Sequence, residues 1–342
     1  MPKNSTKILF LILLISGVLI SLCANSWMGA WMGLEINLLS FIPLLSSNLN
    51  MYSSEASLKY FLIQAIASST LLFMIILKMN LYEMFYLHKD LIWNNLLLIP
   101  LLMKIACAPL HWWLPSIIEG ISWLNCFLLL SIQKITPFLL IAYLLTNSKF
   151  SQLLIMSSAF IGAMGGLNQI STRKILSYSS INHIGWMLTA TIMNSNLWLM
   201  YFIIYTINIS VIINLMSSMN MMYISQAFNS LNSNKMVKFM LFMSLLSLGG
   251  LPPLLGFFPK WMIIYFMIQN MMILTSMILI MTALLTLYYY IRIMYSALMI
   301  TNSELLWSKT MFINNKYSNM MMFNFFNIIL GMSAITLTVF MY

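Results

Sequence analysis

Four charged residues lie inside long apolar stretches of the sequence, and they are the first candidates for chemistry. They are Glu35, Lys104, Lys134 and Lys260. A charge at the centre of a bilayer costs about 2.5–3.5 kcal/mol on insertion scales, so such residues are by default functional candidates. Amines and carboxylates take up and release protons, and this set therefore favours proton translocation.

The three lysines differ in how well a simpler explanation fits them. Lys134 lies near the middle of an apolar run, and its side chain cannot span half of a hydrocarbon core about 30 Å thick to reach water. A structural ion pair is the alternative for this residue. Lys104 and Lys260 both lie close to expected helix breaks. At the break before Lys260, freed backbone carbonyls could solvate an ammonium, and the alternative is a side chain that reaches the membrane surface.

The single acid in this set has small neighbours. Gly29 and Gly33 precede Glu35 in the run 27–45, and small residues allow a second helix to approach closely. A buried acid near a buried base indicates an ion pair.

Two histidines also fall inside apolar stretches. His183 is in the middle of the run 175–193, and His111 lies between Pro109 and Pro115. Imidazole titrates near neutral pH and can pass protons along a chain of waters. A packed, hydrogen-bonded histidine is the alternative interpretation of both residues.

Other classes of site leave no trace in the sequence. Cys23, Cys107 and Cys126 stand alone, without the C-x-x-C spacing of zinc and iron–sulfur sites. No glycine-rich phosphate-binding motif occurs. The net charge of +10 is scattered rather than gathered into a nucleic-acid-binding patch. We expect no metal and no cofactor in this chain.

Composition indicates the elements that must position the charged residues. Of 342 residues, 61% are hydrophobic and 6% are charged, whereas a soluble domain carries about 25% charged residues. The sequence predicts one all-α domain, 1–342, a polytopic transmembrane bundle of about eleven helices. The expected spans are 8–23, 27–45, 58–78, 91–118, 121–146, 150–169, 175–193, 196–218, 239–270, 271–300 and 320–341.

Two of these spans are too long for one straight crossing. The run 91–118 contains Pro109 and Pro115, and the run 239–270 contains Gly249 to Pro253 and then Pro259. Proline removes a backbone donor and clashes with the preceding turn, so we predict two interrupted helices. Transporters place such breaks at ion sites, and a kink that serves packing alone is the alternative.

The distribution of basic residues predicts the orientation of the chain. The N-terminal run has no cleavage site and is expected to remain as a helix. With alternating spans, one side holds Lys3, Lys7, Lys59, Arg173, Lys174, Lys235, Lys238, Arg292, Lys309 and Lys316, and the other holds Lys78, Lys89 and Lys149. The positive-inside rule places the N-terminus in the cytosol or the mitochondrial matrix and the C-terminus on the opposite side.

Three segments carry a resemblance to a known family. They read NSWMGAWMGLEIN at 25–37, RKILSYSSINHIGW at 173–186 and LGGLPPLLGFFPKW at 248–261. They resemble the mitochondrial NADH dehydrogenase subunit 2 family, the antiporter-like membrane subunits of respiratory complex I, in its insect form. The match extends over most of the chain and is least diagnostic after about residue 300.

The resemblance implies a fold and the roles of the site residues. The family has a glutamate that matches Glu35 and lysines that match Lys104, Lys134 and Lys260. Full-length relatives carry the glutamate on a later helix, so this chain resembles an antiporter-like fold that lacks the first three helices. Glu35 would modulate Lys104, Lys104 and Lys134 would carry protons, and Lys260 would lie next to the exit, with His111 and His183 as links through water.

The resemblance also implies the setting. NADH, FMN, iron–sulfur clusters and ubiquinone would belong to partner subunits of an NADH:ubiquinone reductase in the mitochondrial inner membrane. The partners would be other membrane subunits of complex I, neighbouring antiporter-like subunits included, and lipids. Two alternatives remain, a subunit of a separate cation/proton antiporter and a purely structural membrane subunit. The sequence leaves open the proton stoichiometry and whether this subunit pumps or relays.

Overall fold

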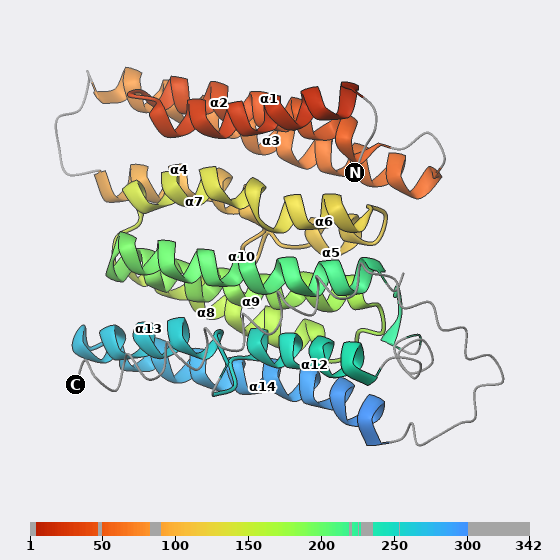
Figure 1. Cartoon of the computed structure of the whole chain (residues 1–342). Helices are drawn as coiled ribbons and strands as arrows, with labels where there is room; N and C mark the ends of the chain where they lie inside the picture. Colours follow the sequence, from red (N-terminus) through yellow and green to blue (C-terminus); the bar gives the residue numbers. More distant parts are fainter. Residues whose placement is uncertain are drawn as a thin grey trace. The chain divides into compact units, whose positions relative to one another are not determined.

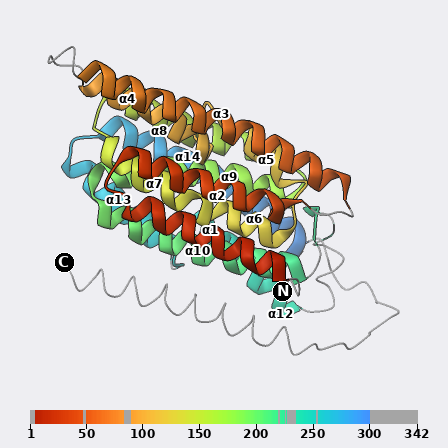
Figure 2. The same cartoon turned by 90° about the horizontal axis from the view of Figure 1, so that it is seen from above.

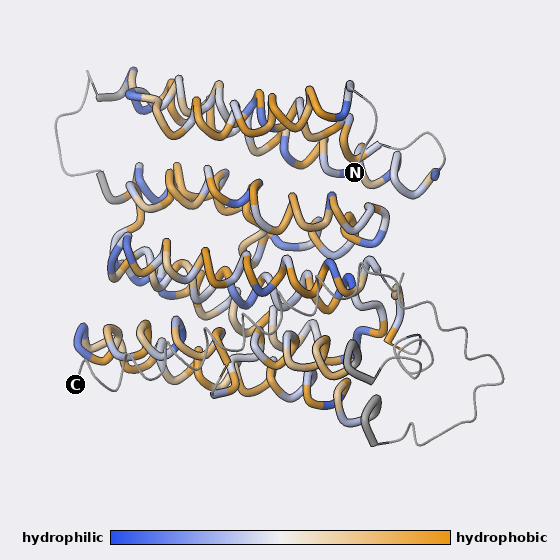
Figure 3. The backbone as a smooth tube through the Cα atoms, viewed as in Figure 1, coloured by the Kyte–Doolittle hydropathy of each residue, from blue (hydrophilic) through white to orange (hydrophobic). Residues whose placement is uncertain are grey.

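The structure, a computed structural model, describes residues 5–46, 50–82, 90–218, 221–224, 226, 235–252 and 254–299. In these residues the regular structure is α-helical, and the one strand-like feature is an isolated bridge between Ser171 and Tyr223. The all-α prediction is confirmed. Apolar residues follow most of each helix, and hydrophilic residues gather near the helix ends and at a few interior positions (Figure 3).

Contacts between helices divide the chain into two compact units, Met1–Leu154 and Ile155–Tyr342 (Figure 1). The first unit contains α1 (Ser5–Cys23), α2 (Trp27–Leu45), α3 (Met51–Tyr82), α4 (Asp90–Ile105), α5 (Trp113–Ile118), α6 (Trp123–Leu130) and α7 (Ile132–Leu144). The boundary falls in α8 (Lys149–Gly166), and the second unit continues with α9 (Thr172–Met193), α10 (Ser195–Ser218), α12 (Lys235–Gly249), α13 (Phe257–Gln269) and α14 (Ile273–Met299). The single domain predicted from the sequence stays a prediction.

Length and composition fit a protein that crosses a membrane several times. In the described part of the chain, 6 helical segments are long and apolar enough to span a bilayer. The helices coincide with the predicted spans from 8–23 through 271–300, and the last predicted span, 320–341, lies outside the described residues. On α1, Ile12 and Leu19 expose 62% and 56% of their surface, as expected for side chains that face lipid.

Glycines bring α1 and α2 into close contact in the first unit. A Cβ added to Gly33 would lie 2.6 Å from the backbone nitrogen of Ser21, and one added to Gly17 would lie 2.9 Å from that of Asn37. The backbones therefore meet without side chains between them, as small residues permit in membrane helices. Next, α2 packs on α3, α3 on α4 and α4 on α7, and these helices share one general direction in both views (Figures 1 and 2).

Both predicted interruptions are present. Between α4 and α5 the chain turns at Ala106, whose φ is 67°, with Cys107 N bonded to Leu102 O at 3.0 Å and Ala106 N to Met103 O at 3.2 Å. This is the pattern of a helix C-terminus closed by a left-handed residue. Between α12 and α13 the left-handed residue is Gly250, with φ 84°.

Prolines act differently from our expectation at several positions. Pro115 and Pro259 lie in the first turns of α5 and α13, where the missing N–H has no helical acceptor to lose. Pro43, Pro100 and Pro137 lie inside α2, α4 and α7 without ending them. The two breaks thus follow from left-handed residues more than from proline alone.

A third irregularity was not predicted. The expected span 121–146 is divided into α6 and α7 at Ser131, whose φ and ψ are −113° and −80°. Lys134 N then donates to Ser131 O, three residues earlier, at 3.0 Å. Ser131 Oγ donates to Phe127 O at 2.6 Å, so a side chain takes part in the hydrogen bonding of this crossing.

Candidate functional site

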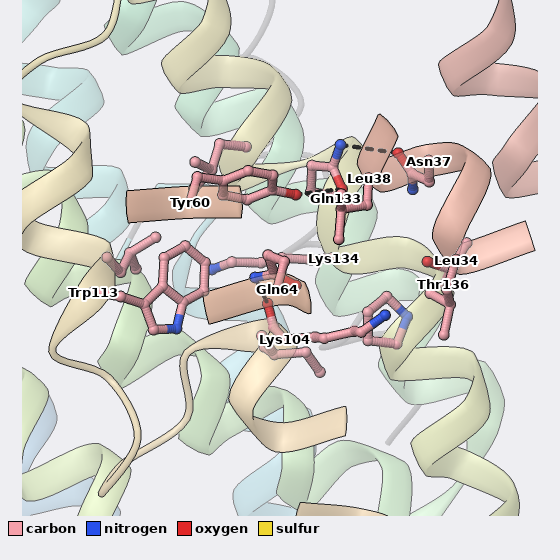
Figure 4. Close-up of a pocket in the computed structure, with 14 residues that line it drawn as sticks. Leu34, Asn37, Leu38, Tyr60, Gln64, Lys104, Trp113, Gln133, Lys134 and Thr136 are labelled. Atoms are coloured by element: carbon pink, nitrogen blue, oxygen red, sulfur yellow. Dashed lines mark hydrogen bonds between the residues drawn. The ribbon is translucent and has the colours of Figure 1, made fainter. Parts of the chain in front are cut away.

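Two of the four charged candidates, Lys104 and Lys134, line one cavity inside the first unit (Figure 4). Lys104 exposes 8% and Lys134 2% of its surface. Counted as space open to the centre of a water molecule, the cavity volume is about 20 Å³, and about 10–15 Å³ suffices to hold one water. The cavity is therefore a chamber that both lysines line and that has room for about one water.

The helix break before α5 positions Lys104. The residue lies in the last turn of α4, where the helix dipole and the terminal carbonyls favour a cation. Trp113 Nε1 donates to Met103 O at 3.0 Å, and Gln64 Nε2 donates to Lys104 O at 3.4 Å. Side chains of α5 and α3 thus donate to carbonyls at the end of the broken helix.

Glu35 acts on Lys104 from a distance. Its negative charge interacts electrostatically with the Lys104 ammonium. No salt bridge within 4.0 Å joins the two side chains, whereas the exposed pair Lys59 and Glu55 lies at 2.6 Å. One carboxylate oxygen of Glu35, Oε2, is buried and has no hydrogen-bond partner among the described residues. The structure therefore holds the expected partners near each other without direct contact.

Lys134 enters the cavity from α7, three residues after the irregularity at Ser131. Beside it runs a chain of polar side chains from three helices. Tyr60 Oη donates to Gln133 Oε1 at 3.3 Å, and Gln133 Nε2 donates to Asn37 Oδ1 at 2.9 Å, both marked by dashed lines in Figure 4. These bonds connect α3, α7 and α2 and fix the wall of the cavity next to Lys134.

Lys260 occupies a different environment in the second unit. It exposes 7% of its surface, and its Nζ donates to Leu248 O at 3.2 Å and to Gly249 O at 2.9 Å. These carbonyls end α12, where the helix dipole is negative. The Nζ also lies 5.9 Å from the centre of the Trp186 ring, within the range of a cation–π contact. Freed carbonyls thus solvate the ammonium, as the sequence indicated.

Both candidate histidines are buried and hydrogen-bonded. His111, in the segment between α4 and α5, has Nδ1 3.2 Å from Pro109 O. A carbonyl only accepts, so Nδ1 carries a proton in this contact. His183 on α9 has Nδ1 2.7 Å from Tyr201 Oη, and its ring lies 5.1 Å from that of Tyr205. Neither histidine lines the cavity of Lys104 and Lys134.

Sequence reasoning missed the polar residues that complete the cavity. Asn37, Gln64, Gln133 and Thr136 all line it. Each is a polar residue within an apolar span, and Asn37, Gln133 and Thr136 lie within two positions of a charged candidate. That proximity was the available signal. In the described ranges, no three His, Cys, Asp or Glu side chains lie together to hold a metal ion.

Comparison with known proteins gives the family. The family model described as NADH:quinone oxidoreductase/Mrp antiporter, transmembrane, matches residues 24–286. NADH-ubiquinone oxidoreductase chain 2 of Anopheles gambiae is 45% identical to this chain, and the alignment covers 96% of each. The protein of the same name from Aedes aegypti is also 45% identical, with 98% of each chain covered.

Solved structures share the fold. A chain from respiratory complex I of Thermus thermophilus with bound aureothin matches with a TM-score of 0.84 at 20% identity, covering 97% of this chain and 79% of that chain. A chain from the Mrp complex of Dietzia sp. DQ12-45-1b gives a TM-score of 0.75 at 16% identity, covering 96% and 75%. The fold, the helix breaks and the insect relatives agree: the chain belongs to the NADH-ubiquinone oxidoreductase chain 2 family of antiporter-like membrane subunits.

Proposed function

We propose that this chain is a proton-translocating membrane subunit of NADH:ubiquinone oxidoreductase, respiratory complex I. The observation that carries the proposal is the cavity that Lys104 and Lys134 both line. Glu35 interacts electrostatically with the first of these lysines. The names of the insect relatives and the family model support the same assignment. NADH, FMN, iron–sulfur clusters and ubiquinone would act in partner subunits and drive this one.

The chemistry follows from charge coupling in a low-dielectric interior. A positive charge on Lys104 is favoured while the negative charge of Glu35 is near, and it becomes unfavourable when that charge moves away or is neutralised. Because Lys104 and Lys134 line the same cavity, a proton on one amine disfavours a proton on the other. The two amines should therefore titrate as a coupled pair, and a proton leaves one when the other gains one.

The energy required is within reach of such coupling. Moving one proton against the membrane potential costs about 2.3 kcal/mol per 100 mV. Each tenfold change in the proton affinity of a site corresponds to about 1.4 kcal/mol. Changes of one or two powers of ten at Lys104 and Lys134 would therefore be enough to move a proton against a potential of about 100 mV.

We place Lys260, His111 and His183 along the same translocation route as proposals. Lys260 would be the site next to the exit, and the histidines would connect sites through water. The setting would be the mitochondrial inner membrane, with the N-terminus in the matrix and the C-terminus in the intermembrane space. The chain would act as one functional domain. Its neighbours would be other membrane subunits of complex I, including antiporter-like ones, and lipids.

The first test is a co-migration experiment. Native membranes would be solubilised gently, assemblies separated by size, and each fraction assayed for NADH oxidation and for this chain. We expect the chain to travel with the NADH-oxidising assembly. If it ran in a smaller assembly without NADH activity that exchanged sodium or potassium for protons, the assignment to complex I would be wrong and the separate antiporter would replace it.

A further inference from the structure

Thr136 differs from the other threonines inside the described helices. The hydroxyls of Thr70, Thr189, Thr191, Thr206, Thr275, Thr282 and Thr286 all donate to a carbonyl three or four residues earlier. The Thr136 hydroxyl, in contrast, is buried and has no hydrogen-bond partner among the described residues, and the residue exposes 1% of its surface. A buried polar atom without a partner is uncommon and calls for an explanation.

The backbone beside Thr136 makes this arrangement more unusual. Pro137 follows it in α7 and has no N–H, so the carbonyl of Gln133 receives no helical hydrogen bond from position 137. That carbonyl is three residues before Thr136, the acceptor position that the other threonines commonly use. Thr136 leaves this acceptor unused. Its hydroxyl is therefore available to a group outside its own helix.

Thr136 lines two cavities of the first unit. One is the chamber of Lys104 and Lys134, and the other is an outer cavity lined by residues of the α1–α2 connection and of the second half of α7. Thr136 is the residue that the two linings share. Along α2 the outer cavity meets Trp27 and Ala30 and the chamber meets Leu34, so the cavities follow one another along the same helices.

The outer cavity has the character of an aqueous vestibule. Its volume, counted in the same way as that of the chamber, is about 320 Å³, enough for several waters at about 30 Å³ each. Asn25 and Ser26, both exposed, line it where α1 ends and α2 begins. Trp27 and Tyr143 also line it, and Tyr143 exposes 81% of its surface. Aromatic residues of this kind are enriched where a membrane meets water.

We propose that the outer cavity is a water-filled access route for protons and that the Thr136 hydroxyl is the link between this route and the chamber of Lys104 and Lys134. The route would open at the membrane face where α1 ends and α2 begins. With the orientation proposed above, that face is the intermembrane-space side. The inference rests on the proposed function. It adds to that function the outer cavity as the route, Thr136 as the linking residue and the intermembrane-space side as the opening.

The transfer needs no reactant besides water. A protonated water in the chamber, having taken its proton from a lysine ammonium, gives it to Thr136 Oγ. The hydroxyl releases its own proton to a water in the outer cavity, so one O–H bond forms as another breaks and no net charge stays on the threonine. Rotation of the hydroxyl about the Cβ–Oγ bond restores the starting state. The reverse order carries a proton inward.

Access is tested by cysteine labelling in the assembled complex. In a Cys23→Ser background, Thr136→Cys would be exposed in sealed vesicles to a membrane-impermeant methanethiosulfonate with a trimethylammonium group, added from one face at a time. Asn25→Cys at the mouth of the outer cavity is the positive control, and Ser158→Cys, fully buried in the second unit, is the negative control. Labelling is measured as the increase in the mass of this chain when the reagent attaches to the cysteine.

We expect Thr136→Cys to react from the same face as Asn25→Cys and at least about tenfold faster than Ser158→Cys, as a water-accessible thiol should. Labelling no faster than that of Ser158→Cys, or only from the opposite face, would overturn the route. This measurement reports access and does not depend on whether the complex pumps.

The role of the hydroxyl is tested by a pair of substitutions. Thr136→Val keeps the shape and removes the hydroxyl, whereas Thr136→Ser keeps it. Since the hydroxyl has no partner among the residues that the structure describes, its removal should leave the amount of assembled complex unchanged. We expect proton translocation coupled to NADH oxidation to fall about fivefold or more in Thr136→Val and to keep more than about half of its rate in Thr136→Ser.

Two outcomes separate the route from the proposed function. If Lys134→Ala abolishes translocation and Thr136→Val does not reduce it, the route through Thr136 is wrong and the function of the chamber stands. If translocation is unchanged in both variants, the proposed function itself fails. Electron transfer from NADH to an artificial acceptor does not involve the membrane subunits. Its rate should be unchanged in every variant, and it serves as the control for the subunits that oxidise NADH.

Discussion

The two units solve the problem of burying a lysine in different ways. In the second unit, Lys260 donates to two carbonyls at the end of α12 and lies over Trp186, so fixed dipoles and a ring stabilise its charge. In the first unit, Lys104 lines a cavity and is influenced by Glu35, which does not touch it. Besides the dipole at the end of α4, the stabilisation of Lys104 thus involves a second titratable group, Glu35.

This difference suggests a division of labour. A charge held by backbone dipoles keeps its environment as long as the helix break keeps its shape. A charge held by a neighbouring carboxylate changes its free energy whenever that carboxylate moves or gains a proton. The first unit is therefore suited to respond to a signal from partner subunits, and the Lys260 site is suited to offer a constant position for a proton.

The largest effect should follow Lys134→Ala. The substitution removes the central amine of the chamber, and we expect coupled proton translocation to fall about a hundredfold or more, the scale of losing a group that transfers protons. Proton uptake and NADH oxidation in reconstituted vesicles measure the effect. Lys149→Ala, at the exposed start of α8, is the matched control and should leave both rates unchanged. Normal pumping by Lys134→Ala would contradict the role of the chamber.

Lys260→Gln separates the charge of Lys260 from its hydrogen bonds. A glutamine amide can donate to the α12 carbonyls but carries no proton across. We expect normal assembly and a fall in translocation of about tenfold or more, measured as protons moved per NADH oxidised. If the glutamine variant pumped normally, Lys260 would only cap the end of α12. The first unit would then hold a functional site and the second unit a structural one.

Glu35→Gln should have an intermediate effect. The change keeps the shape of the side chain and removes the charge that acts on Lys104 without contact, so a loss of about three- to tenfold in coupled turnover is expected. The same substitution at Glu55, which pairs with Lys59 on the exposed surface, should change nothing measurable. Equal results for the two variants would show that Glu35 does not control the chamber.

The smallest effect on turnover should come from Gly250→Ala, which tests the rigidity of the Lys260 site. Gly250 has φ 84°, and an added Cβ would lie 3.0 Å from Lys260 Nζ. A left-handed alanine costs about 1–2 kcal/mol, so heat should inactivate the complex at a temperature about 2–8 °C lower. Gly249→Ala is the control, because its Cβ would have ordinary contacts, 3.5 Å or longer. An unchanged inactivation temperature for Gly250→Ala would argue for a flexible turn.

The sequence was sufficient for most of the fold because bilayer thickness limits what a long apolar run can be. Spans and both interruptions could be predicted from hydrophobic length, Gly250 and the prolines near residues 109 and 259. The split of the span 121–146 could not be predicted, because a serine such as Ser131 is compatible with a regular helix. The departure of its backbone from helical geometry depends on the surrounding packing. The burial of Lys104, Lys134 and Lys260 was predictable for the same reason as the spans.

The organisation of the site was less predictable. The resemblance implied that Glu35 acts on Lys104, but it could not tell that the two interact without a salt bridge, since that depends on the spacing of α2 and α4 to within a few Å. The polar chain from Tyr60 to Asn37 joins residues far apart in sequence. Thr136 lies two positions after Lys134 and directly before Pro137, but the sequence did not show that its hydroxyl makes no bond to its own helix. Its role depends on which cavities it lines, which only the packed structure defines.

The close approach of α1 and α2 has a mechanical consequence. Where Gly17 and Gly33 bring the two backbones together, no side chain can bend to absorb a displacement. The outer face of α1 carries exposed apolar residues, so the contact with α2 is on the other side of the helix. Asn37, which α2 carries into the wall of the chamber, moves with that pair. The side of the chamber that Asn37 lines is thereby held by a backbone-to-backbone contact that leaves little room for movement.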